Sequence, residues 1–410
     1  FNANELNFVE NNGEYLPFLF YKKGSIFHHF AEKIEIRKDI ISSAFYFLSG
    51  WDEFIKKKKI TIENRFNIAD TLQYKRNFVE LPIVDRYCEI FDSVIIHIFP
   101  KQKQSRRWEK GKDFVVTLTH DIDYFPFWTK KHLNEIIDYN KNRLKTSKRL
   151  IEKIKAIYKY IGHSIHKKWF YNHEKNLKKI IKKEKKLGVN STFFMLSEHE
   201  TKVENQNYFL EHNKILKKIL KDSDVGLHGS QKTAHFEENL KLELNHFEEN
   251  EISVNKYRTH YLAFSYHKSF SILENQGIEV DSSLAFWEDL GFRAGVSYPF
   301  YPYNIKEDRQ YKVIEIPLMI MDVTLFSPKA LGLNSRQAWI KLKRIIDNAK
   351  KHHSHICLLW HTITYDFVDF GNFGKLYFKT IKYAKKKNGI IIAQEDLKKR
   401  WLDRINKLTH

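Results

Sequence analysis

Two carboxylates stand where a strongly apolar segment of the chain ends. The stretch "FVVTLTHDIDYF" (114–125) begins with apolar and β-branched residues, typical of a buried strand, and runs directly into Asp121 and Asp123. Alternate side chains of an extended strand share a face, so both carboxylates would point into one space. Two such groups repel each other unless a cation separates their roles. The spacing therefore favours a metal ligand beside a free general base.

Several other apolar runs of the chain also end in residues that can do chemistry. The residues at these ends are His228, Arg258 with His260, Asp281, Asp322 and His361. In barrels and open parallel sheets, functional sites form at the C-terminal ends of the strands. We therefore expect these side chains to share one site.

A carboxylate with two histidines and an open position is a recurrent catalytic zinc arrangement. Asp123, His228 and a second histidine fit this pattern, which leaves Asp121 as a base. The ion would lower the pKa of a bound water toward about 7 and polarise a carbonyl. An Asp-x-Asp triplet is not specific by itself, because glycosyltransferases use one to hold a metal and a nucleotide-sugar. The downstream residues His228, Arg258 and His361 distinguish the hydrolase from that alternative.

Charge is unevenly distributed along the 410-residue chain, whose formal net charge is +20. Residues 130–188 hold 19 Lys or Arg residues against 5 Asp or Glu. A solvated face of lysine-rich helices explains this excess, and so does a site for an anionic membrane surface or a phosphate-bearing substrate. The segment has no nucleic-acid motif, which disfavours nucleic acid as a partner.

Cysteine content and hydropathy bear on the compartment. The two cysteines, Cys88 and Cys357, favour a reducing environment over a disulfide framework. No run of about 18 apolar residues predicts a membrane-spanning helix. We expect a cytoplasmic protein, with a peripheral position at the inner membrane face as an alternative.

The chain divides by pattern into a module at 1–108 and a larger region at 109–410. In the module, Asp39 is a plausible N-cap for a helix over about 40–55, and Pro82 starts a second helix. In the larger region, short apolar runs alternate with helical patterns, which indicates a parallel α/β fold. Residues 129–187 interrupt this alternation as a lysine-rich insertion of two or three helices. The tract "KHHSH" (351–355) resembles a metal-binding segment but is interpreted as a solvated loop.

The order of the motifs resembles that of polysaccharide deacetylases of the NodB-homology, carbohydrate esterase type. The five similar motifs are "THDID" (119–123), "GLHGS" (226–230), "YRTHYLAF" (257–264), "VDSSLAF" (280–286) and "LLWH" (358–361). The segments "GFRAGVSYPFYPY" (291–303) and "IEIPLMIMDVTL" (314–325) resemble a bacterial subgroup that carries its own N-terminal module of uncharacterised function. The likeness covers nearly the whole chain.

The resemblance implies an α/β fold, a distorted (β/α) barrel preceded by a smaller α+β domain. It also implies removal of an N- or O-acetyl group from a sugar of a cell-surface glycan or its precursor, with one divalent ion such as Zn²⁺. By position, Asp121 would be the general base and Asp123 and His228 metal ligands. Arg258 would orient Asp121, and His361 would be the general acid.

One position departs from the pattern of that family. The usual second motif has another metal-binding histidine four residues after the first, and here that residue is Lys232. His260 shares a face with Arg258 at a strand end, so we expect it as the third ligand, with His235 as the alternative. Otherwise the site has two protein ligands, and the chain would be a degenerate, glycan-binding homologue.

Other candidates have less specific signals. Asp281 either holds Arg258 or His361 in place or caps a helix, and Asp322 either supports the site or caps a helix. Arg293 lies between two glycines, which would suit a cation presented to an anionic substrate, or a structural salt bridge. Further residues considered for contact with the substrate or its oxyanion are Trp360 and Tyr124.

Overall fold

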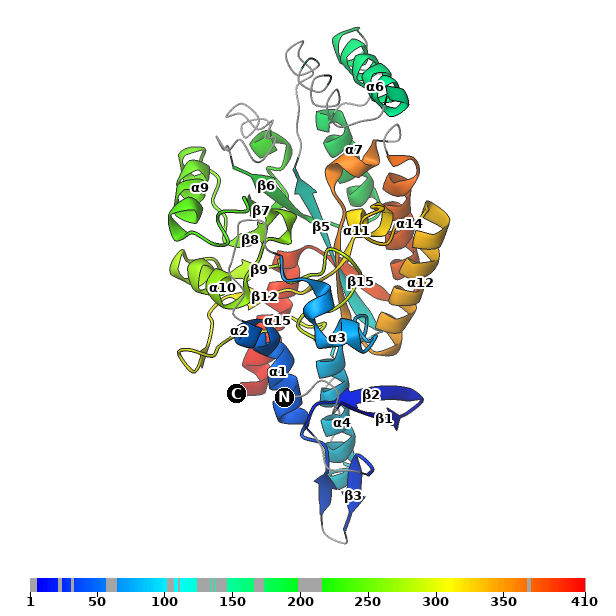
Figure 1. Cartoon of the computed structure of the whole chain (residues 1–410), viewed down its shortest axis with the longest axis vertical. Helices are drawn as coiled ribbons and strands as arrows, with labels where there is room; N and C mark the ends of the chain where they lie inside the picture. Colours follow the sequence, from blue (N-terminus) through cyan, green and yellow to red (C-terminus); the bar gives the residue numbers. More distant parts are fainter. Residues whose placement is uncertain are drawn as a thin grey trace.

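A computed structural model describes most of the chain. The described residues are 6–20, 24–30, 33–56, 65–101, 107–109, 111–123, 134, 137, 146–165, 173–197, 216–366 and 370–409. A small α+β region at the N-terminus adjoins a larger region in which helices surround a parallel sheet (Figure 1). Within the described parts, no helix is both long enough and apolar enough to cross a membrane.

A nine-stranded sheet forms the centre of the larger region, and all its pairings are parallel. Eight strands lie in the order β12-β9-β8-β7-β6-β5-β14-β13, and β15 pairs with the first part of β5. The strands are β5 (Phe114–Ile122), β6 (Thr192–Leu196), β7 (Asp224–Gly229), β8 (Lys256–Thr259), β9 (Val280–Asp281), β12 (Ile314–Glu315), β13 (Leu318–Met321), β14 (His355–Leu359) and β15 (Gly389–Ile392).

The sheet is curled, as the connection between its two ends shows. Its end strands, β12 and β13, are separated along the chain by Ile316 and Pro317 alone. These ends can be so close only because the sheet bends round on itself. The expected distorted (β/α) barrel is therefore confirmed. The apolar run that ends at Asp322 thus contains two short strands, which lie on opposite edges of the sheet.

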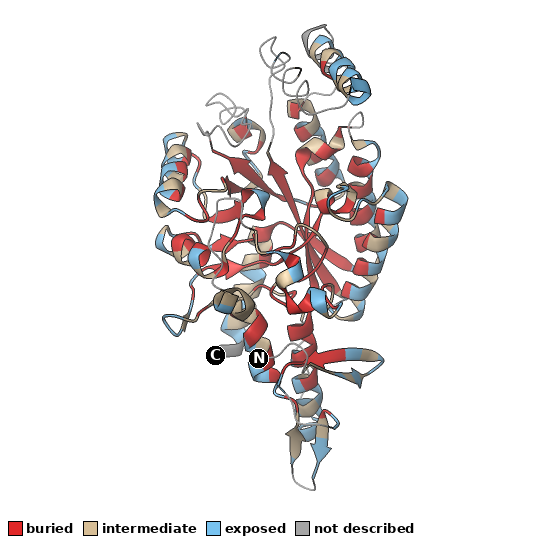
Figure 2. Ribbon diagram, in the orientation of Figure 1, coloured by how far each residue is buried: buried red, intermediate tan, exposed pale blue. Residues whose placement is uncertain are grey.

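Helices cover the outside of the sheet, so strands such as β5 are buried along their whole length (Figure 2). Burial on both faces explains why β5 reads as a continuous apolar run rather than an alternating one. The larger helices are α7 (His173–Lys186), α9 (Glu237–Glu249), α10 (Tyr266–Asn275), α12 (Ser335–Lys351), α14 (Phe373–Lys386) and α15 (Gln394–Thr409), with a short α11 (Asp322–Phe326). Short turns of 3₁₀ helix follow β8 (His260–Leu262) and β14 (Thr362–Tyr365), and a small hairpin pairs β10 (Tyr303–Asn304) with β11 (Arg309–Gln310).

The lysine-rich segment 129–187 contains two helices in its described parts, α6 (Thr146–Ile165) and α7. Apart from residues 134, 137 and 187, the rest of this segment lies outside the described residues, and so does Tyr124. Helix α7 connects β5 to β6 and is part of the barrel. Helix α6 is additional and lies at one extremity of the molecule (Figure 1).

The N-terminal region has antiparallel hairpins, β1 (Asn7–Asn11) with β2 (Glu14–Phe18) and β3 (Phe27–His29) with β4 (Ile34–Ile36), beside a group of helices. Its helices are α1 (Ile40–Leu48), α2 (Trp51–Lys56), α3 (Leu72–Lys75) and α4 (Ile83–Ile98), with a 3₁₀ turn at Ile68–Asp70. Asp39 accepts a hydrogen bond from the backbone N–H of Ser42, which confirms the expected N-cap. The single helix expected over 40–55 is wrong, because Gly50, at φ +62°, separates α1 from α2.

A loop of the larger region joins the N-terminal region to the barrel. The backbone N–H of Phe292 donates to the carbonyl of Val79, and that of Val84 donates to the carbonyl of Gly295. The side chain of Asp85 accepts a bond from the backbone of Ser297. Burial raises the pKa of Asp85 to about 6, although its bonds to Ser297 act in the opposite direction. The two regions therefore share a buried polar seam.

Candidate functional site

Asp121 and Arg258 form the most deeply buried ion pair of the site. Arg258 Nη1 donates to Asp121 Oδ1 at 2.9 Å and to Thr119 Oγ1 at 2.8 Å. Asp121 is the penultimate residue of β5. Arg258 lies on β8, which is separated from β5 in the sheet by β6 and β7. The pair spans the interior of the curled sheet. It holds Asp121 in one orientation while its Oδ2 atom faces His228 at 3.7 Å.

The Arg258 side chain is itself fixed on every side. Its Nε donates to the carbonyl of Ser282 and its Nη2 to Ser282 Oγ, each at 2.9 Å. The guanidinium also lies over the ring of Phe194, 4.4 Å from its centroid. Its exposed fraction is 0%. Such a group costs free energy to bury unless each donor is satisfied, so its bonds favour one rigid position for Asp121.

Asp123, His228 and His260 meet in a cluster whose donor atoms lie within 4.8 Å of one another. His228 Nε2 is 3.1 Å from Asp123 Oδ1, and His260 Nε2 is 3.9 Å from Asp123 Oδ2. Ligands at about 2.0–2.2 Å from a tetrahedral ion lie roughly 3.3–3.6 Å from each other. The observed spacings fall just below and just above this range, so small side-chain shifts would let the three donors hold a divalent ion.

Two atoms of this cluster support the same conclusion. His228 Nε2 and Asp123 Oδ1 are buried and make no hydrogen bond with the described residues. His228 Nδ1 donates to the carbonyl of Arg258 at 3.0 Å, which leaves the lone pair of Nε2 available for a metal in the neutral tautomer. Burial opposes the charged form of His228, but the carboxylates of Asp121 and Asp123 outweigh it and raise its pKa. The same negative charge would attract a cation, which binds by displacing that proton.

His361 reaches the same site from the end of β14. Its Nδ1 donates to Asp322 Oδ1 at 2.6 Å, and its backbone N–H donates to Asp322 Oδ2 at 2.9 Å. Its Nε2 lies 3.4 Å from Asp123 Oδ2. Burial disfavours the imidazolium, but the carboxylates of Asp322 and Asp123 outweigh burial and raise the pKa of His361 to about 10. A protonated His361 is suited to act as a general acid.

A second group, Asp121 with Asp123 and His361, also lies within ligand spacing. It is the weaker choice for a metal, because Arg258 already neutralises Asp121. His361 is bonded through Nδ1 to Asp322, and its raised pKa keeps a proton on the ring. The first cluster contains no carboxylate paired with an arginine, although the pKa of His228 is raised as well.

These side chains line one cavity of about 250 Å³. Its lining residues are Arg65, Asp121, Asp123, His228, Thr259, His260, Tyr261, Leu262, Trp287, Met321, Val323, Leu359 and His361. Of the residues expected at strand ends, five line this cavity and three, Arg258, Asp281 and Asp322, do not. It is named the catalytic cavity for the role predicted from the sequence.

Comparisons with known proteins give a family for the N-terminal region only. Residues 2–100 match a family of unknown function, DUF7033, as expected for a module without a known role. No curated protein matches the chain.

Solved structures with a similar fold include two deacetylases. A candidate polysaccharide deacetylase from Mycobacterium smegmatis is 14% identical, with a TM-score of 0.47 over 74% of this chain and 95% of its own. The Puue allantoinase is 11% identical, with a TM-score of 0.46 and the same coverage. The chitin deacetylase of the fungal pathogen Colletotrichum lindemuthianum is 12% identical, with a TM-score of 0.36 over 69% of this chain and 86% of its own. Because these TM-scores are all below 0.5, the fold is assigned from the strand order of the sheet and not from these similarities.

Other candidates from the sequence lie around the site or away from it. Asp281 Oδ1 accepts from Ser283 Oγ at 2.6 Å, one residue beyond the Ser282 that holds Arg258. Asp281 thus lies behind Arg258, and its side chain accepts hydrogen bonds from Ser283 rather than from Arg258. His235 is buried but does not line the catalytic cavity or belong to either metal group. Burial lowers the pKa of His235 to about 4.

Arg293 and Trp360, considered for substrate contact, are placed in the interior. Arg293 forms an ion pair with Glu53 of α2 at 2.7 Å. Of the two roles expected for Arg293, this is the structural salt bridge rather than the contact with an anionic substrate. Trp360 is 0% exposed and packs against Tyr377. A substrate reaching Trp360 would have to open the core, so it is a core residue here.

Three residues that shape the site are not predicted from the sequence: Ser282, Tyr261 and Arg65. Ser282 lies within "VDSSLAF", but nothing in that motif shows that its hydroxyl and carbonyl face Arg258. Tyr261 has a positive φ of 58°, which turns its ring against His260 at 3.8 Å between centroids. Such a conformation is rare for a bulky residue and has no signature in sequence.

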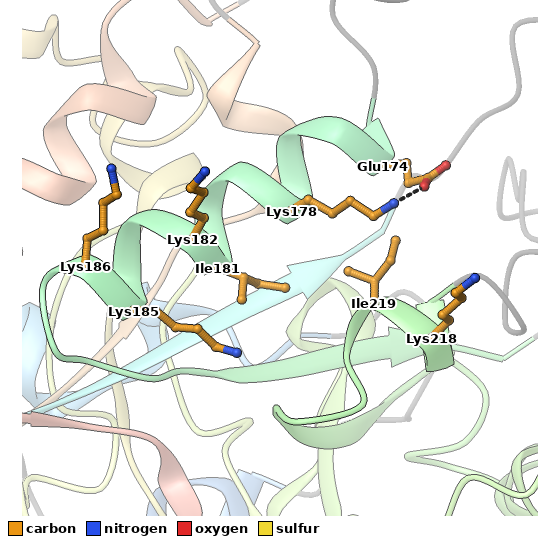
Figure 3. A pocket seen from close by; sticks show the side chains of 8 residues that line it. All are labelled: Glu174, Lys178, Ile181, Lys182, Lys185, Lys186, Lys218 and Ile219. Atoms are coloured by element: carbon orange, nitrogen blue, oxygen red, sulfur yellow. Dashed lines mark hydrogen bonds and ion pairs between the residues drawn. The ribbon is translucent and has the colours of Figure 1, made fainter.

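A separate hollow of about 760 Å³ lies on the lysine-rich side of the barrel and shares no lining residue with the catalytic cavity. It is lined by five lysines, Glu174 and two isoleucines from α7 and residues 218–219 (Figure 3). Lys178 pairs with Glu174, and the other lysines project around the hollow. This patch is part of the charge excess seen in sequence, and its role as an anion site stays a prediction.

Proposed function

We propose that the chain is a metal-dependent hydrolase that removes an acetyl group from an N- or O-acetylated sugar of a cell-surface glycan or its precursor. One observation carries the proposal: a carboxylate fixed by Arg258 and a histidine fixed by Asp322 face the same cavity as a three-residue metal donor set. That combination supplies a base, an acid and an electrophile, which acyl transfer to water requires. The order of the five motifs along the chain supports the same reaction.

Asp123, His228 and His260 would hold the ion, which we take to be zinc. When bound, such an ion lowers the pKa of water and polarises the acetyl carbonyl. The remaining chemistry belongs to the side chains of the chain itself.

Asp121 acts as the general base. Arg258 occupies its Oδ1, so Oδ2 is the atom that takes a proton from the attacking water. The water oxygen forms a bond to the acetyl carbon while the proton moves to Asp121. Asp281 helps to position the base at a distance, through the Ser282–Ser283 segment that fixes Arg258.

His361 acts as the general acid. It gives the proton on Nε2 to the nitrogen or oxygen of the sugar as the bond to the acetyl carbon breaks. Acetate and a free amine or hydroxyl group are the products. Asp322 keeps Nδ1 protonated, so Nε2 is the position from which the proton leaves.

The two rival functions make different demands on the same residues. A glycosyltransferase would need both Asp121 and Asp123 for a metal–diphosphate, and the Arg258 ion pair opposes that use of Asp121. A degenerate glycan-binding homologue would bind sugar without a metal or turnover.

The test measures bound metal and acetate release on the same protein preparations. Metal-replete wild type should carry about one divalent ion per chain and release acetate from an acetylated amino sugar or oligosaccharide. Asp121→Asn should keep the ion and lose about 10²–10⁴-fold in rate, because only the base is removed. Lys75→Gln, an exposed change in the N-terminal region, serves as the control. Wild type that binds no metal and releases no acetate from any such sugar would contradict the proposal.

We also propose that α6 lies against an anionic lipid surface, because its apolar side chains face outward. Leu150, Ile151, Ile154, Tyr158 and Ile161 are 45–60% exposed. At 100° per residue they occupy an arc of about 100° on the helix. The basic residues Lys148, Arg149, Lys153 and Lys155 flank this arc on both sides. This is the pattern of helices that lie in a membrane interface.

Vesicle sedimentation tests this partner. Wild type should bind vesicles that contain phosphatidylserine much better than vesicles of phosphatidylcholine alone. Ile151→Ser with Ile154→Ser should abolish binding, whereas Ile340→Ser, a similarly exposed change on α12, should not. Vesicle binding by the double variant equal to that of wild type would contradict the proposal. So would a dimer in solution that the double variant disrupts while vesicle binding stays the same.

A further inference from the structure

Among the described residues that line the catalytic cavity, Arg65 is the one that belongs to the N-terminal region. The other lining residues that the structure describes belong to the barrel, from β5 onward. The N-terminal region, whose matched family has no known function, therefore supplies a cation to the cavity where acetyl transfer is proposed.

The guanidinium of Arg65 is placed by two aromatic rings. Its central carbon lies 5.1 Å from the centroid of Trp287 and 5.7 Å from that of Tyr261. Both rings also line the catalytic cavity. Stacking on aromatic rings orients a guanidinium without using its N–H donors.

Those donors are not used by the described part of the protein. Among the described residues, Arg65 makes no hydrogen bond and no ion pair within 4.0 Å. Burial lowers the pKa of Arg65, with Glu288 and Tyr261 acting in the opposite direction, but arginine remains charged at neutral pH. Arg65 is half-buried and lines the cavity, so its donors stay open to water and to a ligand that accepts from them.

Arg65 also lies at the boundary with a larger groove. A hollow of about 850 Å³ runs between the N-terminal region and the barrel, and Arg65 lines it together with Phe66, Lys268, Asn304 and Tyr311 among others. Ligand pockets usually measure about 300–1,000 Å³. The catalytic cavity alone is below this range, so a saccharide would need the groove for its remaining parts. Arg65 stands where such a chain would pass from the groove to the cavity.

We propose that Arg65 binds an anionic substituent, a carboxylate or a phosphate, on the saccharide whose acetyl group occupies the catalytic cavity. The planar fork of arginine can donate two parallel bonds to either group. The substrate class is then an acetylated, negatively charged sugar or oligosaccharide. The N-terminal region is part of the substrate site. This inference rests on the proposed function for the acetyl group, but the anion contact can be measured without turnover.

Calorimetric titration of the full chain tests the contact with three probes. The neutral probe is N-acetylglucosamine, the phosphate probe is its 6-phosphate, and the carboxylate probe is N-acetylmuramic acid. Wild type should bind at least one anionic probe about 10-fold or more tightly than the neutral one. The tighter of the two anionic probes identifies which substituent the site takes. Arg65→Gln should remove the preference and leave the affinity for the neutral probe unchanged.

Two further variants separate the contact from folding and general charge. Arg65→Lys should keep part of the preference, because it retains the charge but not the bidentate fork. Lys75→Gln removes a cation from the same region outside both hollows and should keep the whole preference. A preference that survives in Arg65→Gln, or its absence in wild type, would overturn the proposal. Loss of binding for all three probes in both Arg65 variants would make Arg65 a structural residue and would also overturn it.

Acetate release, followed in parallel, distinguishes the two proposals. An anion preference that depends on Arg65, without any acetate release, would reject the hydrolase and leave the anion site. Acetate release without such a preference would reject the anion site and leave the hydrolase.

Discussion

The Nδ1 atom of His361 lies 2.6 Å from Oδ1 of Asp322, and the two carboxylate oxygens of Asp322 are both used at this strand end. Oδ2 accepts from the backbone N–H of His361 and from Thr364 Oγ1 at 2.8 Å. The carboxylate therefore fixes the backbone, the ring orientation and the tautomer of His361 together. Asp322 supports the acid without touching the substrate.

This relationship predicts the effect of Asp322→Asn. The amide can keep most of the geometry but not the negative charge that favours imidazolium. We expect kcat for an N-acetylated sugar to fall about 10–100-fold, with little change in KM. The loss should be much smaller for p-nitrophenyl acetate, whose leaving group needs no proton. An equal loss on both substrates would assign Asp322 a structural role, and Thr364→Val, which keeps the carboxylate, is the matched control.

The third metal ligand gives a second prediction. His260→Ala should lower bound metal and acetate release together, because it removes one of three donors. His235→Ala should lower neither, since His235 is outside the donor set. Metal content by elemental analysis and acetate release are the two measurements. The reverse pattern would make His235 the ligand, and metal binding that neither change affects would reject the site.

The seam between the two regions gives a third prediction. A Cβ added at Gly291 would lie 2.3 Å from Val79 Cγ1 and 2.4 Å from the Val79 carbonyl oxygen. The carbonyl belongs to the backbone and cannot turn away, so Gly291→Ala must displace the N-terminal region. We expect a loss of about 1–3 kcal/mol in the free energy of unfolding. We also expect a weaker anion preference, because Arg65 moves with that region. Urea denaturation measures the first effect and titration the second, with Lys75→Ala as the exposed control.

Much of the site could be predicted because the chemistry follows strand ends. Asp121, Asp123, His228 and His361 each close an apolar run, and parallel strands bring such ends together. His260 followed from its spacing to Arg258. These predictions needed only local pattern and one rule of topology.

The residues that could not be predicted depend on contacts distant in the chain. Arg65 is near Trp287 only because the loop around Gly291 inserts into the N-terminal region. The strands β6 and β15 were not identified, since "TFFML" and "GIII" are short runs without a chemical residue at their ends. His355 was interpreted as part of a solvated loop, and this is wrong. It is the first residue of β14 and is 0% exposed.

The burial of His355 leads to the last prediction, which concerns pH and stability. His355 Nε2 lies 2.8 Å from Thr117 Oγ1, and Nδ1 donates to the carbonyl of Ser297 at 2.9 Å. Burial lowers the pKa of His355 to about 4, although the bond to Ser297 acts in the opposite direction. The unfolded chain, with a pKa near 6.5, binds the proton first as the pH falls. His355 therefore stabilises the fold fully above about pH 6.5 and loses this contribution between pH 6.5 and 4.

The contribution lost should be roughly 3 kcal/mol, from a pKa difference of about 2.5 units. Urea denaturation of wild type and His355→Gln at pH 7.0, 5.5 and 4.5 measures it. The variant is expected to start less stable at pH 7.0, so the informative quantity is how much each protein loses on acidification. His355→Gln should lose less than wild type, whereas His353→Gln, at an exposed position of the preceding turn, should lose the same amount. Equal losses in wild type and His355→Gln would mean that protonation of His355 does not lower the free energy of unfolding. The lowered pKa assigned to the buried His355 would then be wrong.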